Sequence, residues 1–179
     1  MIRDIKEILL TEEQIAGKVK ELATKISEDY RNKDLLVVGI LKGSVMFASD
    51  LIKNITIPCE IDFMAVSSYG SSTETSGVVR ILKDLDHSIE GKDIIIVEDI
   101  IDSGVTLDYL LKYLKTRKAN SIEIITFLTK PSRRKVDIQV KYCGFEVPDE
   151  FLVGYGLDFA EKYRNLPYVG ILKEEVYKN

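Results

Sequence analysis

Residues that are able to bind a phosphorylated sugar gather in the segment 97–106. Two adjacent carboxylates, Glu98 and Asp99, follow an apolar run, and Asp102 comes after two isoleucines. The segment closes with residues suited to a tight turn and to hydrogen bonding, namely Ser103, Gly104, Val105 and Thr106. Where a strand turns into a helix at a glycine, free backbone amides, nearby hydroxyls and the helix dipole favour a phosphate monoester. The paired carboxylates suit ribose hydroxyls or a hydrated magnesium ion.

A simpler interpretation of the same residues stays open. Asp102 and Ser103 are both types that cap the N-terminus of a helix, and the acids before them would then be solvated. Two other phosphate-binding loops, GxGxxG and GxxxxGK[ST], do not occur in the sequence. Three acids combined with a glycine-hydroxyl turn favour the phosphosugar hypothesis over a plain cap.

The elements that must position this segment alternate between extended and helical patterns. Strands are predicted at Leu35–Leu41, Ile57–Ala65, Ile94–Val97 and Ile122–Leu128. Helices are predicted after the capping box at Thr11, over Val45–Ile52 and from about Thr106. This order indicates an α/β domain with a mostly parallel sheet, in which ligands bind beyond the carboxyl ends of the strands. The acids of segment 97–106 are expected there.

Composition narrows the class of protein. The chain has 179 residues, 45% hydrophobic and 30% charged, so residues 1–179 are predicted to form a single domain. A net charge of -4 and a pI near 5.2 argue against a nucleic-acid partner. Cys59 and Cys143 suggest neither disulfides nor a metal motif, which favours a cytoplasmic location. No signal peptide and no apolar run of about 20 residues is present, so no membrane partner is expected.

Several motifs, in a consistent order, resemble one family. An apolar strand, two acids, two apolar residues and Asp-Ser-Gly-Val-Thr resemble the phosphoribosyl-pyrophosphate motif of type I phosphoribosyltransferases. Further segments resemble the hypoxanthine-guanine branch of that family: Leu41-Lys42-Gly43, Ser68-Tyr69, the run from Val147 to Asp158, and Tyr163-Arg164-Asn165-Leu166. The sequence is identified as a member of this family over nearly its whole length. The resemblance implies an α/β fold with a mostly parallel central sheet flanked by helices, and a small hood formed by the terminal segments and a mobile loop.

The resemblance also implies a reaction. A phosphoribosyl group would pass from 5-phosphoribosyl 1-pyrophosphate to hypoxanthine or guanine, giving IMP or GMP and pyrophosphate. The positions that match the donor site are Lys42, Gly43, Ser68, Tyr69, Glu98, Asp99, Asp102, Ser103, Gly104, Val105, Thr106 and Arg164. Lys42 and Gly43 match a pyrophosphate-binding loop, often with a cis peptide, although an ordinary turn is the alternative. Arg164 matches a second pyrophosphate contact, with an ion pair to Glu161 as its alternative. The segment 67–77 matches a lid loop that excludes water.

The base is expected to bind where other matched residues meet Asp102. Asp102 matches the general base that takes a proton from the purine's imidazole ring. Lys130 matches the lysine that donates to the 6-oxo group, which would exclude adenine. Phe151 matches the ring that stacks on the base, and the main chain of Leu152 matches a contact to its edge. Asp158 matches both the purine site and the magnesium ligands, which are implied to be Glu98, Asp99 and Asp158. The family further implies a homodimer or a homotetramer.

Two hypotheses from other classes compete with this assignment. A nucleotide-sensing regulator on the same fold would keep the phosphate cradle and bind nucleic acid, but the acidic pI weighs against it. A phospho-acceptor signalling domain would carry its acid pair after the first strand. Lys42 and Gly43 follow Leu35–Leu41 instead.

Overall fold

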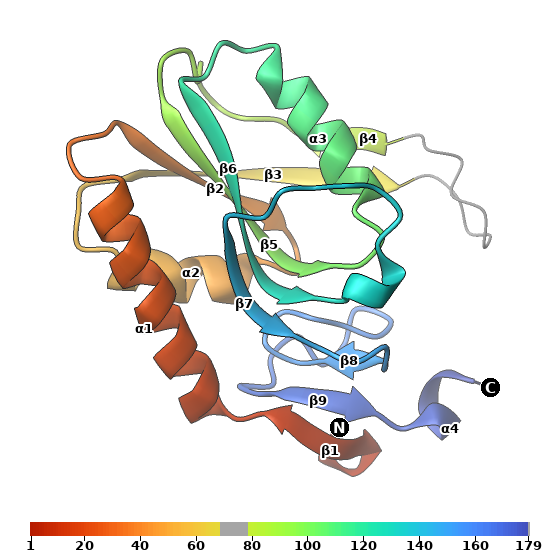
Figure 1. The fold of residues 1–179 in the computed structure, drawn as a ribbon. Helices are drawn as coiled ribbons and strands as arrows, with labels where there is room; N and C mark the ends of the chain where they lie inside the picture. The colour runs from red at the N-terminus through yellow and green to blue at the C-terminus, as the bar shows by residue number, and fades with distance from the viewer. Residues whose placement is uncertain (69–78, 179) are drawn as a thin grey trace.

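The computed structural model describes residues 1–68 and 79–178, in which strands and helices alternate (Figure 1). The strands are β1 (Ile5–Leu10), β2 (Leu35–Leu41), β3 (Glu60–Ser68), β4 (Val79–Lys83), β5 (Asp93–Ile101), β6 (Ser121–Thr129), β7 (Tyr142–Glu146), β8 (Leu152–Val153) and β9 (Val169–Leu172). The helices are α1 (Glu12–Asp29), α2 (Val45–Asn54), α3 (Val105–Lys115) and α4 (Glu174–Tyr177), with short 3-10 turns at Ile2–Asp4 and Pro131–Arg133. None of these helices is long and apolar enough to cross a membrane.

A six-stranded sheet in the order β4-β3-β2-β5-β6-β7 forms the centre of the fold. All neighbouring strands pair in parallel except β4, which runs antiparallel to β3 at one edge. Helices flank this sheet on both faces (Figure 1). The predicted α/β class with a mostly parallel sheet is therefore confirmed.

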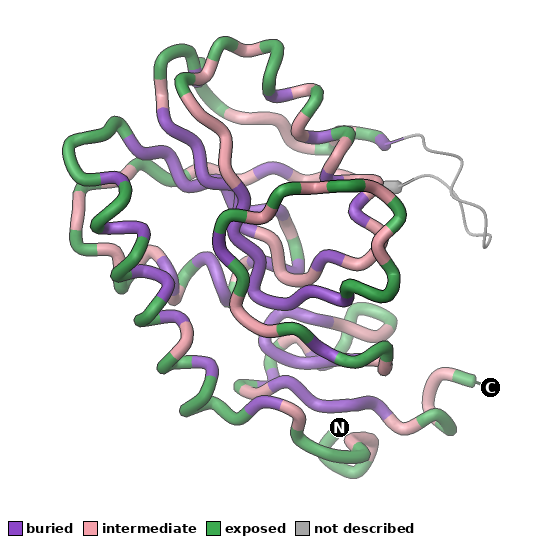
Figure 2. Tube along the Cα trace, in the orientation of Figure 1, coloured by how far each residue is buried: buried purple, intermediate pink, exposed green. Residues whose placement is uncertain are grey.

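Burial on both faces explains why the central strands have continuous apolar sequences. Val37 and Ile95 pack into a core with α1 and α2, whereas their neighbours Val38 and Ile96 pack into a second core with α3. Figure 2 shows the buried residues concentrated in these strands and along the inner side of α1. The capping box predicted at Thr11 is present, because the Thr11 side chain accepts from Gln14 N and Gln14 accepts from Thr11 N.

The position of the site follows from the strand order. The chain leaves β2 through α2 towards β3 and leaves β5 through α3 towards β6, so neighbouring strands β2 and β5 diverge to opposite sides. In open parallel sheets such a switch point opens a crevice at the carboxyl ends of the strands. The two loops at this crevice are 42–44, after β2, and 102–104, after β5.

The two ends of the chain form a second, three-stranded sheet in the order β1-β9-β8. Strand β1 pairs antiparallel with β9, and β9 pairs antiparallel with β8. Tyr155, which follows β8, packs on Phe127 of β6 with ring centroids 4.9 Å apart. The terminal part of the predicted hood is therefore present. Most of the lid segment 67–77 lies outside the described residues.

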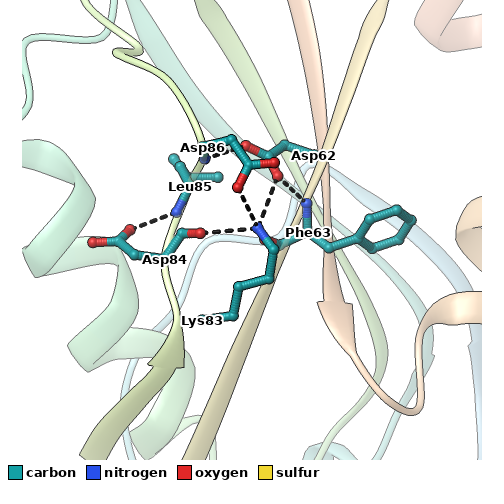
Figure 3. Close-up of polar contacts among 6 residues, drawn as sticks. All are labelled: Asp62, Phe63, Lys83, Asp84, Leu85 and Asp86. Atoms are coloured by element: carbon teal, nitrogen blue, oxygen red, sulfur yellow. Dashed lines mark hydrogen bonds and ion pairs between the residues drawn. The ribbon is translucent and has the colours of Figure 1, made fainter.

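A lysine at the edge of the central sheet fixes the chain between β4 and β5. Lys83 Nζ donates to the carbonyl oxygens of Phe63 and Asp84 at 2.9 Å and to the carboxylates of Asp86 and Asp62 at 3.1 and 3.2 Å (Figure 3). Asp62 is only 10% exposed, so the ammonium compensates a carboxylate that has lost most of its water. The network ties the edge strand β4 to β3.

The start of β3 and the end of α2 are among the element boundaries that differ from the sequence expectation. Strand β3 begins at Glu60 rather than Ile57, and Pro58, which has no amide for a strand ladder, accounts for the later start. Helix α2 continues to Asn54 rather than ending at Ile52.

Candidate active site

Residues from the carboxyl ends of the central strands line two cavities that share Ile100 and Asp102. The larger cavity has a volume of about 480 Å³ and reaches into the second sheet and α4. The smaller, of about 200 Å³, lies against the turn into α3. Asp102 is thus placed where the two cavities meet.

Glu98 and Asp99 lie within strand β5, not after its end. The expectation that the strand stops at Val97 is wrong, because pairing with β6 continues to Ile101. Successive side chains of a strand point to opposite faces. Glu98 accordingly lines the smaller cavity beside the 103–106 turn, and Asp99 lines the larger one. The two carboxylates serve different cavities.

The turn from β5 into α3 leaves the start of the helix open to an anion. Gly104 is the N-cap residue of α3, with φ of 81°. Because glycine has no side chain, the N-cap residue makes no side-chain hydrogen bond to the first amides of the helix. The Ser103 hydroxyl accepts only a long 3.4 Å hydrogen bond from Val105 N. A conventional cap by Asp102 or Ser103 is therefore not what the structure has. Thr106 also lines this cavity, so amides, hydroxyls and the helix dipole converge on it.

The packing around Gly104 also requires glycine. A Cβ at Gly104 would lie 2.8 Å from Ile138 Cδ1 and 3.1 Å from Val136 Cγ2. The positive φ and this packing against segment 134–138 both require glycine, and Lys135 N donates to Ser103 O from the same segment.

The loop after β2 approaches Asp99 more closely than any side chain would allow. A Cβ on Gly43 would overlap the Asp99 carboxylate, and a Cβ on Gly156 would overlap the Gly43 carbonyl oxygen. Gly156 has φ of 100°, a conformation that favours glycine. Strand β5, the loop after β2 and the turn after β8 therefore meet at Gly43. The peptide bond between Leu41 and Lys42 is cis.

Lys42 and Arg164 join a cluster of charges beside this loop. Lys42 Nζ pairs with Glu161 at 2.8 Å, and both side chains are exposed. Arg164 donates to Gly156 O at 2.7 Å and pairs with Asp158 at 3.0 Å. The pair of Arg164 with Glu161, the alternative left open by the sequence, is also present at 3.4 Å. Arg164 is therefore tied to the same turn that contacts Gly43.

Lys130 is the buried cation of the larger cavity. It is 7% exposed, and its Nζ donates to Glu150 O at 2.8 Å. Its Nζ also lies 3.8 Å from Asp149 Oδ1 and 4.0 Å from Asp102 Oδ1. The cavity wall includes the predicted residues Phe151, Leu152 and Asp158.

Asp102 has an oxygen poised to accept a hydrogen bond. Its Oδ1 is buried and has no hydrogen-bond partner among the described residues. A buried acceptor without a partner costs free energy, on the order of 1–3 kcal/mol. A ligand donor in the larger cavity would recover that energy.

Glu98 and Asp99 of β5 hold their protons more tightly than free side chains do, because the pKa of each is raised. Burial raises the pKa of Asp99 to about 6, with Asp102 adding to the rise, while the Ile100 amide and Arg164 oppose it. Burial also raises the pKa of Glu98 well above its usual value, and the charge of Asp99 adds to this. A cation or a sugar hydroxyl beside these groups would favour their ionised forms.

The described residues suit a magnesium ion that keeps water and substrate oxygens as ligands. No group of three metal-ligating side chains occurs within residues 1–68 and 79–178. Magnesium prefers one or two carboxylates together with substrate phosphates, so this does not disqualify the site. Asp99 and Asp158 line the same cavity, and Glu98 lines the other. These carboxylates are the ones able to hold it.

Sequence reasoning missed some of the lining residues, and some of its predictions fall outside the described chain. Tyr69 lies outside it, and Ser68 is the last residue of β3. The cavity residues that were not predicted are Ile100, Arg133, Asp149, Glu150, Leu157 and Tyr177. Arg133 follows Lys130 by three residues, and this proximity in the sequence could have predicted that Arg133 lines the same cavity. No local signal would have found Tyr177, because α4 reaches the cavity only through the second sheet.

Comparisons with known proteins identify the family of the chain. Residues 6–160 match the family model of the phosphoribosyl transferase domain. The chain therefore belongs to the phosphoribosyltransferase family.

Its relatives within the family carry a more specific name. Hypoxanthine-guanine phosphoribosyltransferase of Bacillus subtilis (strain 168) is 56% identical over 179 residues, covering 100% of this chain and 99% of the relative. The protein of that name from Staphylococcus aureus (strain Mu50) is 58% identical, covering 100% of both. A crystal structure of a hypoxanthine phosphoribosyltransferase from Staphylococcus aureus matches with a TM-score of 0.97 at 57% identity, covering 100% of this chain and 97% of that one. The resemblance read from the motifs is confirmed.

Replacing Gly43 should damage phosphoribosyl transfer. In G43A the new methyl group displaces the Asp99 carboxylate or the loop, and misplacements of about 1 Å in a site reduce rates by about a hundredfold. Steady-state kcat/KM for the sugar donor measures the effect. G17A is the matched control, because a Cβ at Gly17 in α1 meets nothing within 4 Å. It should keep the activity and add about 0.5–1 kcal/mol of stability. Wild-type activity in G43A would contradict the close approach.

Asp99 should give the substrate-free protein a defined pH dependence of stability. Its folded pKa of about 6 exceeds the value of about 3.9 in unfolded chains, so between these pH values the folded state binds more protons. The Asp99 contribution therefore becomes less favourable as pH rises and is constant above about 6. Urea unfolding of wild type and D99N from pH 4 to 8 tests this. The free energy of unfolding of D99N minus that of wild type should rise with pH and then level off. A difference that does not change with pH would contradict the raised pKa of Asp99.

Proposed function

We propose that the chain is a purine-salvage enzyme that converts hypoxanthine and guanine, with 5-phosphoribosyl 1-pyrophosphate, to IMP and GMP. The observation that carries this proposal is the meeting of Asp102, at the end of the phosphosugar motif, with the buried Lys130 at 4.0 Å. A phosphosugar cradle and a base cavity therefore share one acid. The names of the relatives from Bacillus subtilis and Staphylococcus aureus support the same substrates.

The smaller cavity supports binding of the donor's 5-phosphate. Amides of the first turn of α3, with the hydroxyls of Ser103 and Thr106, would hold its oxygens. Glu98 and Asp99 would accept hydrogen bonds from the ribose hydroxyls, and their charge would favour a sugar that becomes cationic in the transition state. The backbone from Lys42 to Gly43, together with Ser68, Tyr69 and Arg164, would bind the pyrophosphate.

The larger cavity supports binding of an oxopurine. Lys130 Nζ already donates to Glu150 O, which aims the ammonium and leaves further protons for the 6-oxo group. Adenine presents an amino donor at that position, so two donors would face each other and adenine would be excluded. Phe151 would stack on the base, and the Leu152 backbone and Asp158 would meet its edge.

Asp102 would act as the general base. A ring nitrogen of the purine forms the bond to the anomeric carbon while the bond from that carbon to pyrophosphate breaks. The proton on the imidazole ring would then pass to Oδ1 of Asp102, which accepts no hydrogen bond from the described residues and lies 4.0 Å from Lys130 Nζ. Glu98, Asp99 and Asp158 are the residues that would hold a magnesium ion, and the ion would then neutralise charge on the departing pyrophosphate.

The setting of the enzyme belongs to the same proposal. Residues 1–179 would work as one phosphoribosyltransferase domain in the cytoplasm, as a homodimer or homotetramer. Its partners would be its small-molecule substrates, with no nucleic acid and no membrane.

A base panel tests the substrate assignment. With magnesium and the sugar donor, hypoxanthine and guanine should be converted, and adenine should react at least about a thousandfold more slowly because of the unpaired donors at Lys130. Turnover of adenine or orotate at an equal rate would refute the substrate assignment. No turnover of any base would refute the enzyme and favour a nucleotide-sensing regulator.

Removing the proposed base should separate binding from chemistry. D102N should bind the donor as wild type does but lose about a hundredfold or more in kcat, the usual contribution of general base catalysis. D108N is the matched control, because Asp108 lies on α3 in an ion pair with Lys112 at 2.7 Å. Unchanged turnover in D102N would remove Asp102 from this role.

A further inference from the structure

The Phe151 ring is not an isolated wall of the larger cavity. Tyr177 of α4 stacks on it, with ring centroids 4.7 Å apart and an interplanar angle of 26°. Phe159 meets it in a T-shaped contact at 5.6 Å and 88°. One face of Phe151 is therefore covered by a ring that is nearly parallel to it.

Backbone hydrogen bonds hold the segment that carries Tyr177. Leu172 N donates to Phe151 O at 2.8 Å, and Lys173 N donates to Asp4 O at 2.9 Å, just before α4 begins. Val176 and Tyr177 belong to the same apolar cluster as Phe151. The position of Tyr177 is therefore fixed relative to the Phe151 backbone.

Tyr177 also lines the larger cavity, together with Lys130 and Asp102. A stacking ring binds a base well only if its plane is already set, because ordering a free side chain costs conformational entropy on binding. A parallel aromatic neighbour restricts that plane. With one face of Phe151 occupied, the opposite face is the one left for a planar ligand.

We propose that Tyr177 is a positioning residue for the purine base, which it serves by packing flat on Phe151 and holding that ring parallel to the bound base. The inference rests on the proposed function, since it takes an oxopurine as the planar ligand. The effect of Tyr177 would be confined to binding of the purine base. Among the described residues, none of α4 lines the smaller cavity, where the 5-phosphate of the donor would bind, so binding of that phosphate should not depend on Tyr177.

Steady-state kinetics on the full chain tests the proposal. Y177A should raise KM for hypoxanthine and guanine about three- to tenfold, the size of an aromatic pair contribution, with kcat and donor KM unchanged. Y177F should restore the wild-type KM, because the ring carries the effect. Y177L keeps apolar volume without a ring and should resemble Y177A. Y109A, at an exposed position on α3, is the control for loss of a tyrosine elsewhere.

A double-mutant cycle shows whether Tyr177 acts through Phe151. In an F151L background, Y177A should add less than twofold to the base KM. Full additivity, a parallel rise in donor KM, or a lower base KM in Y177A would overturn the proposal. The last result would mean that Tyr177 occupies the position of the base. If wild type itself converts no base, the proposed function fails first, and the two failures are thereby distinguished.

Discussion

The close approach of three backbone segments at Gly43 is the constraint on which the site depends. The Asp99 carboxylate fills the space where a side chain would be, and the Gly43 carbonyl fills the same space at Gly156. The central sheet, the loop after β2 and the second sheet are therefore held in contact through glycines. Arg164 strengthens this contact by donating to Gly156 O. A side chain at Gly43 would displace either this loop or the Asp99 carboxylate, which lines the larger cavity.

The cations of the site lie within ion-pair distance of carboxylates. Lys42 pairs with Glu161, Arg164 with Asp158, and Lys130 lies near Asp102 and Asp149. Substrate anions would replace these partners rather than meet bare cations, which limits the cost of desolvation on binding. Glu98 and Asp99 differ from these cations, because burial raises the pKa of each carboxyl and so disfavours its ionised form. A ligand cation or hydrogen-bond donor beside them would favour the ionised form again.

The two cavities lie against different parts of the fold. The smaller one is made by the central sheet and α3, whereas the larger one also uses the turn after β8 and the helix α4. Asp102 and Ile100 belong to both linings. A sugar on one side and a base on the other would therefore meet at Asp102, and the aromatic pair of Phe151 and Tyr177 would act on the base side alone.

The sequence by itself determined the α/β class, the strands β2, β3, β5 and β6 of the central sheet, the turn after β5 and the family. Strands β2 and β5 are buried on both faces and so have continuous apolar sequences, and the motif from Glu98 to Thr106 is short and local. The resemblance to the family also singled out Lys130 and Arg164 as site residues. Only the tertiary structure decided which cavity each acid faces, because that depends on how far β5 pairs with β6. Only the tertiary structure showed that Tyr177 packs on Phe151 and that Gly156 lies against Gly43. These contacts join segments that are distant along the chain, so no periodic pattern in the sequence predicts them.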